Sequence, residues 1–206
     1  MVFFIIIRFI SGLSSAFVLI FGTALILPSI QALGKKSLST SHFMGVGFGI
    51  VMSSILVTFL GELGFHWDDL WIGVAMLSVI LAVPIFIYTP NEILQHSYSQ
   101  NSNYKNNFSF SLISISYGLY GFGYVILGTF ISAMARETSG LEATEMYVWL
   151  LVGLAGIPMV IFWPWFGKKI GNDLALFFAC AIMGLGVLMP VLLENKVGIT
   201  SASILL

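Results

Sequence analysis

The sequence predicts an all-α polytopic membrane protein, and two observations carry this prediction. Six charge-free apolar runs fill most of the 206 residues. Each run has the roughly 20 residues that a helix needs to cross a bilayer. Hydrophobic residues make up 58% of the chain and charged residues only 8%, whereas soluble domains carry about 25% charged residues. Transmembrane strands would instead show short segments of alternating polarity, so the expected spans are helices.

Charged residues bound the six runs in order: Arg8 and Lys35, Lys36 and Glu62, Asp69 and Glu92, Lys105 and Arg136, Glu145 and Lys168, and Asp173 and Glu194. A seventh run begins after Lys196 and reaches Leu206, which is too short to span. We therefore expect six full transmembrane helices and the start of a seventh. The chain opens directly on a helix without a secretory signal, and the seventh run stops in mid-crossing. We therefore expect sequence to be missing at both ends.

Composition excludes several functional classes. A net charge of −1 offers no basic face for nucleic acid. The single cysteine, Cys180, permits no internal disulfide and no cysteine-based metal site. An intramembrane enzyme needs a nucleophile with a base, paired carboxylates or metal ligands within the spans. No acidic residue or histidine lies deep in any of the six runs, so we expect no enzyme, no metal site and no cofactor.

The distribution of basic residues predicts the orientation. Alternate loops on one side hold five basic residues, and the loops on the other side hold two, Arg136 and Lys196. Basic residues favour the cytoplasmic face, so the first, third and fifth loops should be cytoplasmic and Met1 external. The third loop is rich in Asn and Ser and too poor in apolar residues to order itself. We expect a helical bundle over residues 1–90, a cytoplasmic linker over 91–110 and a second bundle over 111–206.

Arg8 is the first candidate functional residue, because a charged side chain in hydrocarbon costs at least ~2.5 kcal/mol without water or a partner. Gly12, Ser15 and Ala16 follow on the same side of the helix. Small residues in such a row let another helix approach closely. The alternative is that Arg8 lies near the end of its span and extends to the interface.

The fourth run holds the second candidate group. Tyr117, Tyr120 and Tyr124 fall at offsets of three and four residues, so they share one helix face. Gly118 and Gly121 permit local bending, which suits a helix that borders a cavity. The alternative is a helix-packing groove whose tyrosines bond to neighbouring helices.

Several of these residues carry a family resemblance. The pattern Arg8-x-x-Ser11-Gly12-x-Ser14-Ser15-Ala16 resembles the fourth-helix signature of major facilitator superfamily transporters. The next run, with Gly45 and Gly49, stands where the antiporter signature of the fifth helix would be, but Ile50 and Ser53-Ser54 replace its proline and paired glycines. The fourth run, from Ser116 through Thr129 to Arg136, is similar to the seventh helix of bacterial YbfB/YjiJ-type members. Trp163 to Gly171 resembles their basic loop between helices eight and nine, although Asn172 and Asp173 replace expected basic residues.

The resemblance implies that the chain covers helices four to nine and the first part of ten. It implies a secondary active transporter of a small solute in the bacterial inner membrane, working by alternating access, with proton coupling left open. The implied partners are the solute, the lipid bilayer, and the missing helices or a second chain. The alternative is a non-transporting remnant or a membrane interaction protein.

The resemblance also implies roles for individual residues. The implied cavity residues are Arg8, Tyr117, Tyr120, Tyr124 and Thr129. The implied helix-packing residues are Gly12, Ser15, Ala16, Gly45, Gly49, Gly118 and Gly121. The implied cytoplasmic loop motif consists of Gly167, Lys168, Lys169 and Gly171.

Overall fold

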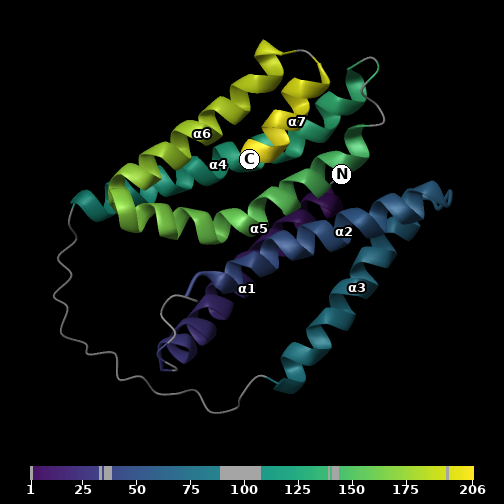
Figure 1. Cartoon of the computed structure of the whole chain (residues 1–206). Helices are drawn as coiled ribbons and strands as arrows, with labels where there is room; N and C mark the ends of the chain where they lie inside the picture. The colour runs from purple at the N-terminus through teal and green to yellow at the C-terminus, as the bar shows by residue number, and fades with distance from the viewer. Residues whose placement is uncertain are drawn as a thin grey trace. The chain divides into compact units, whose positions relative to one another are not determined.

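The computed structural model describes residues 2–32, 34, 39–88, 108–138, 140, 144–193 and 195–206, and all regular structure in these ranges is helical. Figure 1 shows the helices in chain order, which are α1 (Val2–Ala32), η2 (Ser41–Phe43), α2 (Met44–Glu62), α3 (Trp67–Tyr88), α4 (Phe108–Glu137), α5 (Glu145–Ile170), α6 (Asn172–Leu192) and α7 (Lys196–Leu205).

Six of these helices, α1 to α6, are long and apolar enough to cross a membrane, with mean hydropathies between 1.5 and 2.6. The seventh, α7, is a ten-residue apolar helix. These helices confirm the predicted all-α polytopic membrane fold with six candidate spans. Helix α4 begins at Phe108, so its first three residues fall within the predicted linker 91–110. The rest of that linker lies outside the described residues, and the predicted domain boundaries stay a prediction.

The chain divides into two compact units. The first comprises Met1–His42 and Pro90–Tyr98, and the second comprises Phe43–Thr89 and Ser99–Leu206. Within the first unit, α1 is exposed along nearly its whole length. Near its end, Thr23 Oγ1 donates a hydrogen bond to the Leu19 carbonyl at 2.8 Å. The ring of His42 lies 3.3 Å from Thr23 Oγ1 through Nε2 and 3.0 Å from the Ser39 carbonyl through Nδ1, so the chain after α1 folds back onto it.

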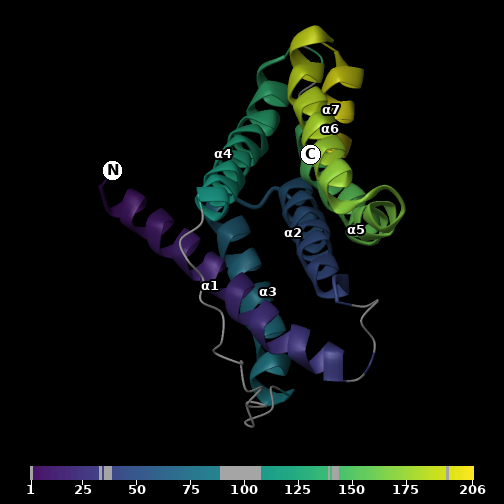
Figure 2. The ribbon, with the colours of Figure 1, turned by 90° about the vertical axis from the view of Figure 1, so that its left-hand side faces the viewer.

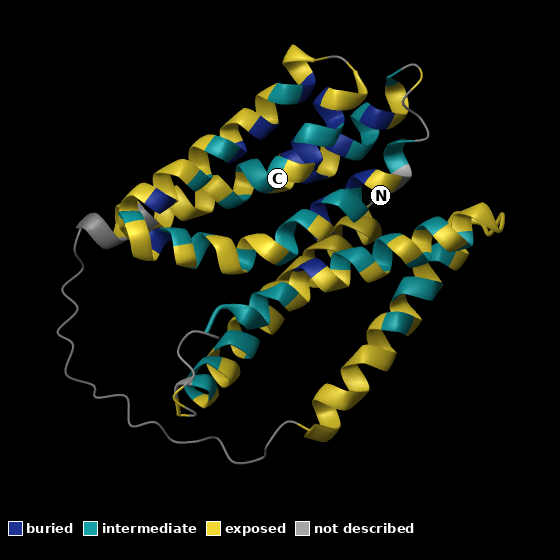
Figure 3. Ribbon diagram, viewed as in Figure 1, coloured by how far each residue is buried: buried dark blue, intermediate teal, exposed yellow. Residues whose placement is uncertain are grey.

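Helix α5 is the centre of the second unit, because it contacts α2, α4, α6 and α7. Figure 2 shows α6 and α7 running together beside it. The buried core lies where α4, α5 and α7 meet (dark blue in Figure 3) and consists of Ile131, Ala135, Val148, Ile199 and Ala202. Two prolines, Pro158 and Pro164, lie inside α5. The first turn of α7 is capped by Asn195, whose side-chain oxygen accepts hydrogen bonds from Val197 N at 2.9 Å and Gly198 N at 3.1 Å.

The most extensive helix pair joins α2 to α5, and two glycines let their backbones meet. A Cβ atom on Gly47 would lie 3.1 Å from the Gly153 carbonyl oxygen and 2.7 Å from Ile157 Cγ1. A Cβ atom on Gly153 would lie 3.0 Å from the Gly47 carbonyl oxygen. Both helices therefore need glycine at the crossing, as small residues commonly allow in membrane helix pairs.

Candidate functional site

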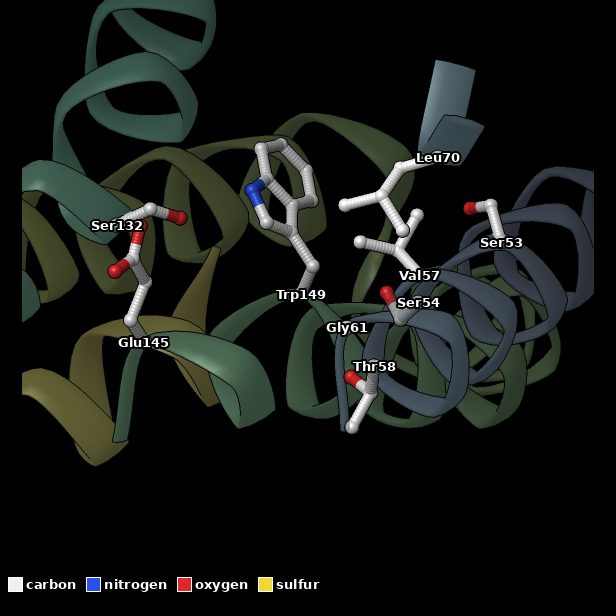
Figure 4. A pocket seen from close by; sticks show the side chains of 9 residues that line it. All are labelled: Ser53, Ser54, Val57, Thr58, Gly61, Leu70, Ser132, Glu145 and Trp149. Atoms are coloured by element: carbon white, nitrogen blue, oxygen red, sulfur yellow. The ribbon is translucent and has the colours of Figure 1, made fainter. Parts of the chain in front are cut away.

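A cavity of about 510 Å³ lies between α2, α3, α4 and α5, and we call it the α2–α5 cavity (Figure 4). Its lining residues are Ser53, Ser54, Val57, Thr58 and Gly61 from α2, Leu70 from α3, Ser132 from α4, and Glu145 and Trp149 from α5. Four hydroxyls, one carboxylate and one indole thus face a shared space in a chain that is otherwise mostly apolar. The α2–α5 cavity lies towards the ends of the helices that the loop charges predict to be external.

Trp149 is held in the cavity wall by a glycine on the neighbouring helix. A Cβ atom on Gly128 of α4 would lie 3.2 Å from Cη2 of the indole. The ring therefore occupies the space that a side chain at Gly128 would fill, and Figure 4 shows it standing between Ser132 and Leu70. The residue types at these two positions fix one face of the cavity.

Glu145 is the only ionisable residue among the described residues of the lining. Its Oε1 lies 3.7 Å from Arg136 Nη1, which is a Coulombic contact longer than a hydrogen bond. The Glu145 side chain is 33% exposed and that of Arg136 is 64% exposed. The pair links the end of α4 to the start of α5 and leaves the carboxylate free to accept further donors.

Ser132 and Ser53 offer contrasting hydroxyls to the same cavity. Ser132 Oγ is buried and has no hydrogen-bond partner among the residues that the structure describes. A buried hydroxyl left in this state costs about 1–3 kcal/mol. Ser53 Oγ instead donates to the Ile50 carbonyl of its own helix at 3.0 Å. Ser132 therefore offers the cavity a buried hydroxyl that no described residue uses.

The predicted tyrosines lie at a second cavity, of about 420 Å³, which we call the tyrosine cavity. It is lined by Leu112, Ser116, Tyr117 and Tyr120 from α4 and by Leu176, Ala179 and Cys180 from α6. Tyr117 is 76% exposed and Tyr120 is 40% exposed. Tyr124 is half-buried one turn further along α4. Thr129 is exposed, and its hydroxyl donates to the Val125 carbonyl at 2.7 Å.

Arg8 lies in the first unit, whereas the tyrosines lie in the second. Its guanidinium carbon is 5.1 Å from the centroid of the Phe4 ring, one turn earlier on α1. Gly12, Ser15 and Ala16 are exposed on the same helix, and a Cβ atom on Gly12 would meet no atom of the described residues within 4 Å beyond its own helix backbone. A cavity shared by Arg8 and the tyrosines stays a prediction.

The described residues show a close helix approach at a glycine pair that the resemblance does not imply. Added Cβ atoms on Gly45, Gly49, Gly118 and Gly121 would meet no atom within 4 Å among the described residues, and the packing role of these glycines stays a prediction. Gly47 and Gly153 make the close approach between α2 and α5. Sequence reasoning missed this pair because a helix with glycine at every second position does not show which face meets a neighbour. It also treated Glu145 only as a loop charge, although its place one turn before Trp149 was a usable signal.

The predicted loop motif forms a tight break between two helices. Gly167, Lys168 and Lys169 lie in the last turn of α5, and Gly171, with φ of +94°, separates α5 from α6. Its amide donates to the Gly167 carbonyl at 2.9 Å. Lys169 Nζ lies 4.0 Å from the centroid of the Trp165 ring, so this cation is held over an aromatic face.

Comparison with known proteins gives one match. A family model described as the uncharacterised MFS-type transporter YbfB matches residues 1–206. Searches of curated proteins and of solved structures found no match. The family predicted from Arg8, the tyrosine helix and the basic loop is confirmed. A match over the full sequence, on a chain with six candidate spans, shows that this protein belongs to the YbfB family of MFS-type transporters.

Proposed function

We propose that the chain serves a secondary active transporter that moves a small solute across the bacterial inner membrane by alternating access. The observation that carries the proposal is the match of a transporter family over residues 1–206. Alternating access places the solute site near the middle of the membrane, between moving helical bundles. Intramembrane polar and ionisable residues mark such pathways.

The positions of the two cavities support a route along α4. Ser132 lines the α2–α5 cavity, and Tyr117 lines the tyrosine cavity. These residues are separated on one helix by a rise of about 22 Å, at about 1.5 Å per residue. The two cavities therefore approach opposite faces of a hydrocarbon core about 30 Å thick. We propose that Tyr117, Tyr120, Tyr124 and Thr129 contact the solute along this route, together with Arg8.

Uptake into liposomes tests the proposal directly. The purified chain is reconstituted and incubated with a defined mixture of small amines, acids, sugars and nucleosides, and the solutes retained in the lumen are identified by mass spectrometry. We expect saturable accumulation of at least one solute above that in empty liposomes. An imposed pH gradient, applied in either direction, shows whether a proton is the coupling ion.

The alternative proposal is a membrane interaction protein without transport activity. The exposed surface favours this alternative, because the apolar stretches of α1 and α3 that could span a membrane contain no buried residues. These helices present apolar faces that other helices could cover. A chain that is helical by circular dichroism, accumulates no solute in either gradient direction and purifies with a stoichiometric membrane partner would support this alternative and contradict transport.

A further inference from the structure

We propose that the α2–α5 cavity binds a small organic cation with a primary ammonium group and a compact apolar body. The proposal deepens the proposed transport function by naming the class of solute, and it rests on that function for the view that the bound molecule is cargo. Three features of the lining lead to this class: the charge of Glu145, the unused hydroxyl of Ser132 and the face of Trp149.

The charge of the lining selects a cation. Glu145 is the only ionisable residue among the nine described residues that line the cavity, so the charge of this lining is negative. Arg136 does not satisfy this carboxylate. The contact is 3.7 Å long, and the arginine side chain is 64% exposed, so solvent screens the pair. A ligand ammonium inside the cavity could approach the carboxylate to hydrogen-bonding distance, which Arg136 does not do.

The unpartnered hydroxyl selects a cation that carries N–H groups. Ser132 Oγ is buried without a hydrogen-bond partner among the described residues, and it opens onto the same cavity as Glu145 (Figure 4). A primary ammonium has three donors. One can reach the Glu145 carboxylate while another reaches Ser132 Oγ. A quaternary ammonium would neutralise the charge but would leave the Ser132 oxygen unsatisfied.

The remaining lining selects an apolar body. Trp149, Val57 and Leu70 supply apolar surface, and the indole face attracts a cation held within about 6 Å of its centre. The volume of about 510 Å³ is that of a small-molecule site. A benzylammonium ion has the required ammonium and a compact apolar ring, so it serves as the probe.

Binding is measured by isothermal titration calorimetry on the chain in nanodiscs of phosphatidylcholine at neutral pH, with empty nanodiscs as the blank. Three probes that share the benzyl group are compared: benzylammonium, neutral benzyl alcohol and the bulkier benzyltrimethylammonium, which has no N–H. We expect saturable binding of benzylammonium, with an affinity about tenfold or more above that of either comparison probe. Equal affinities for benzylammonium and benzyl alcohol would overturn the proposal. This comparison needs no substitution, so no folding defect can obscure it.

Variants then assign the contacts. Glu145→Gln should weaken benzylammonium binding about tenfold or more, while Glu62→Gln should leave it unchanged. Glu62 is the matched control because it is also a carboxylate at a helix end of the second unit but does not line this cavity. Ser132→Ala should weaken benzylammonium binding severalfold and leave benzyltrimethylammonium binding unchanged. Unaltered benzylammonium binding by a folded Glu145→Gln chain would also overturn the site.

The outcome of this experiment is separable from that of the transport assay. Uptake of a solute into liposomes without benzylammonium binding would remove the cation site and leave the proposed transport function standing. Benzylammonium binding without uptake of any solute would keep the site and remove its role in transport.

Discussion

At the scale of single residues, the α2–α5 crossing depends on side chains that are absent. A Cβ atom on Gly47 would lie 3.1 Å from the carbonyl oxygen of Gly153, and a Cβ atom on Gly153 would lie 3.0 Å from that of Gly47. A Cβ atom on Gly49, two residues further along α2, would meet no atom of the described residues within 4 Å. Gly47 and Gly49 thus differ in their surroundings, because only Gly47 lies at the crossing with α5.

We expect Gly47→Val to lower the free energy of unfolding by about 1–3 kcal/mol, because the new side chain must displace backbone atoms of α5. Gly49→Val is the matched control, since it makes the same chemical change on the same helix where there is space. Thermal unfolding in detergent, followed by circular dichroism, measures both. Equal destabilisation by the two variants would show that helix propensity, and not the crossing, sets the cost.

The cap of α7 gives a second residue-scale prediction. Asn195→Ala removes the oxygen that accepts from Val197 N and Gly198 N. Loss of such a cap costs about 0.5–2 kcal/mol. Asn195→Asp keeps an acceptor at the same position and should retain most of the stability. Thermal unfolding of the three chains should place the alanine variant lowest, and an aspartate variant as unstable as the alanine variant would contradict the capping role.

At the scale of elements, the sequence predicted every described span, because long apolar runs leave no alternative to a helix in lipid. Two kinds of detail were beyond it. Helix α4 starts at Phe108, inside an Asn-rich and Ser-rich stretch whose composition alone suggests a linker. The cavity residues Ser132, Glu145 and Trp149 come from two helices, and no periodicity within either helix shows which faces of the two meet.

The orientation of the helices is a prediction at this scale. Single cysteines at Ser102 and Glu62, introduced in a Cys180→Ser background, are tested with an impermeant thiol reagent on intact cells. The background is needed because Cys180 is exposed. The excess of basic residues on one set of loops predicts labelling at position 62 and protection at position 102. Labelling at 102 with protection at 62 would reverse the orientation.

At the scale of the whole molecule, most large apolar side chains on α1 and α3 are exposed. Exposed apolar side chains are expected where helices face lipid, and they also suit contact with further helices. Alternating access needs two bundles that move about a common site. The family match shows that the chain belongs to a transporter family. The oligomeric state of the particle that transports is measurable.

We expect solute uptake only from particles that contain more than one chain, because the exposed apolar faces of α1 and α3 suit contact with further helices and alternating access needs two bundles that move about a common site. Detergent-solubilised protein is separated by size, the mass of each fraction is measured by light scattering, and each fraction is reconstituted for uptake. Saturable uptake by the fraction with the mass of one chain would contradict this expectation.

The prolines of α5 give this central helix a particular mechanical character. Pro158 and Pro164 lack the amide hydrogens that would bind the carbonyls of Leu154 and Val160, so the helix ladder is interrupted twice. The helix that contacts α2, α4, α6 and α7 therefore has two positions at which it can bend. Glu145 and Trp149 lie before Pro158, and Lys169, which stacks on Trp165 of the same helix, lies after Pro164. Because each proline removes one hydrogen bond along α5, a ligand bound at Glu145 and Trp149 can tilt the first segment of the helix relative to the segment that carries Lys169.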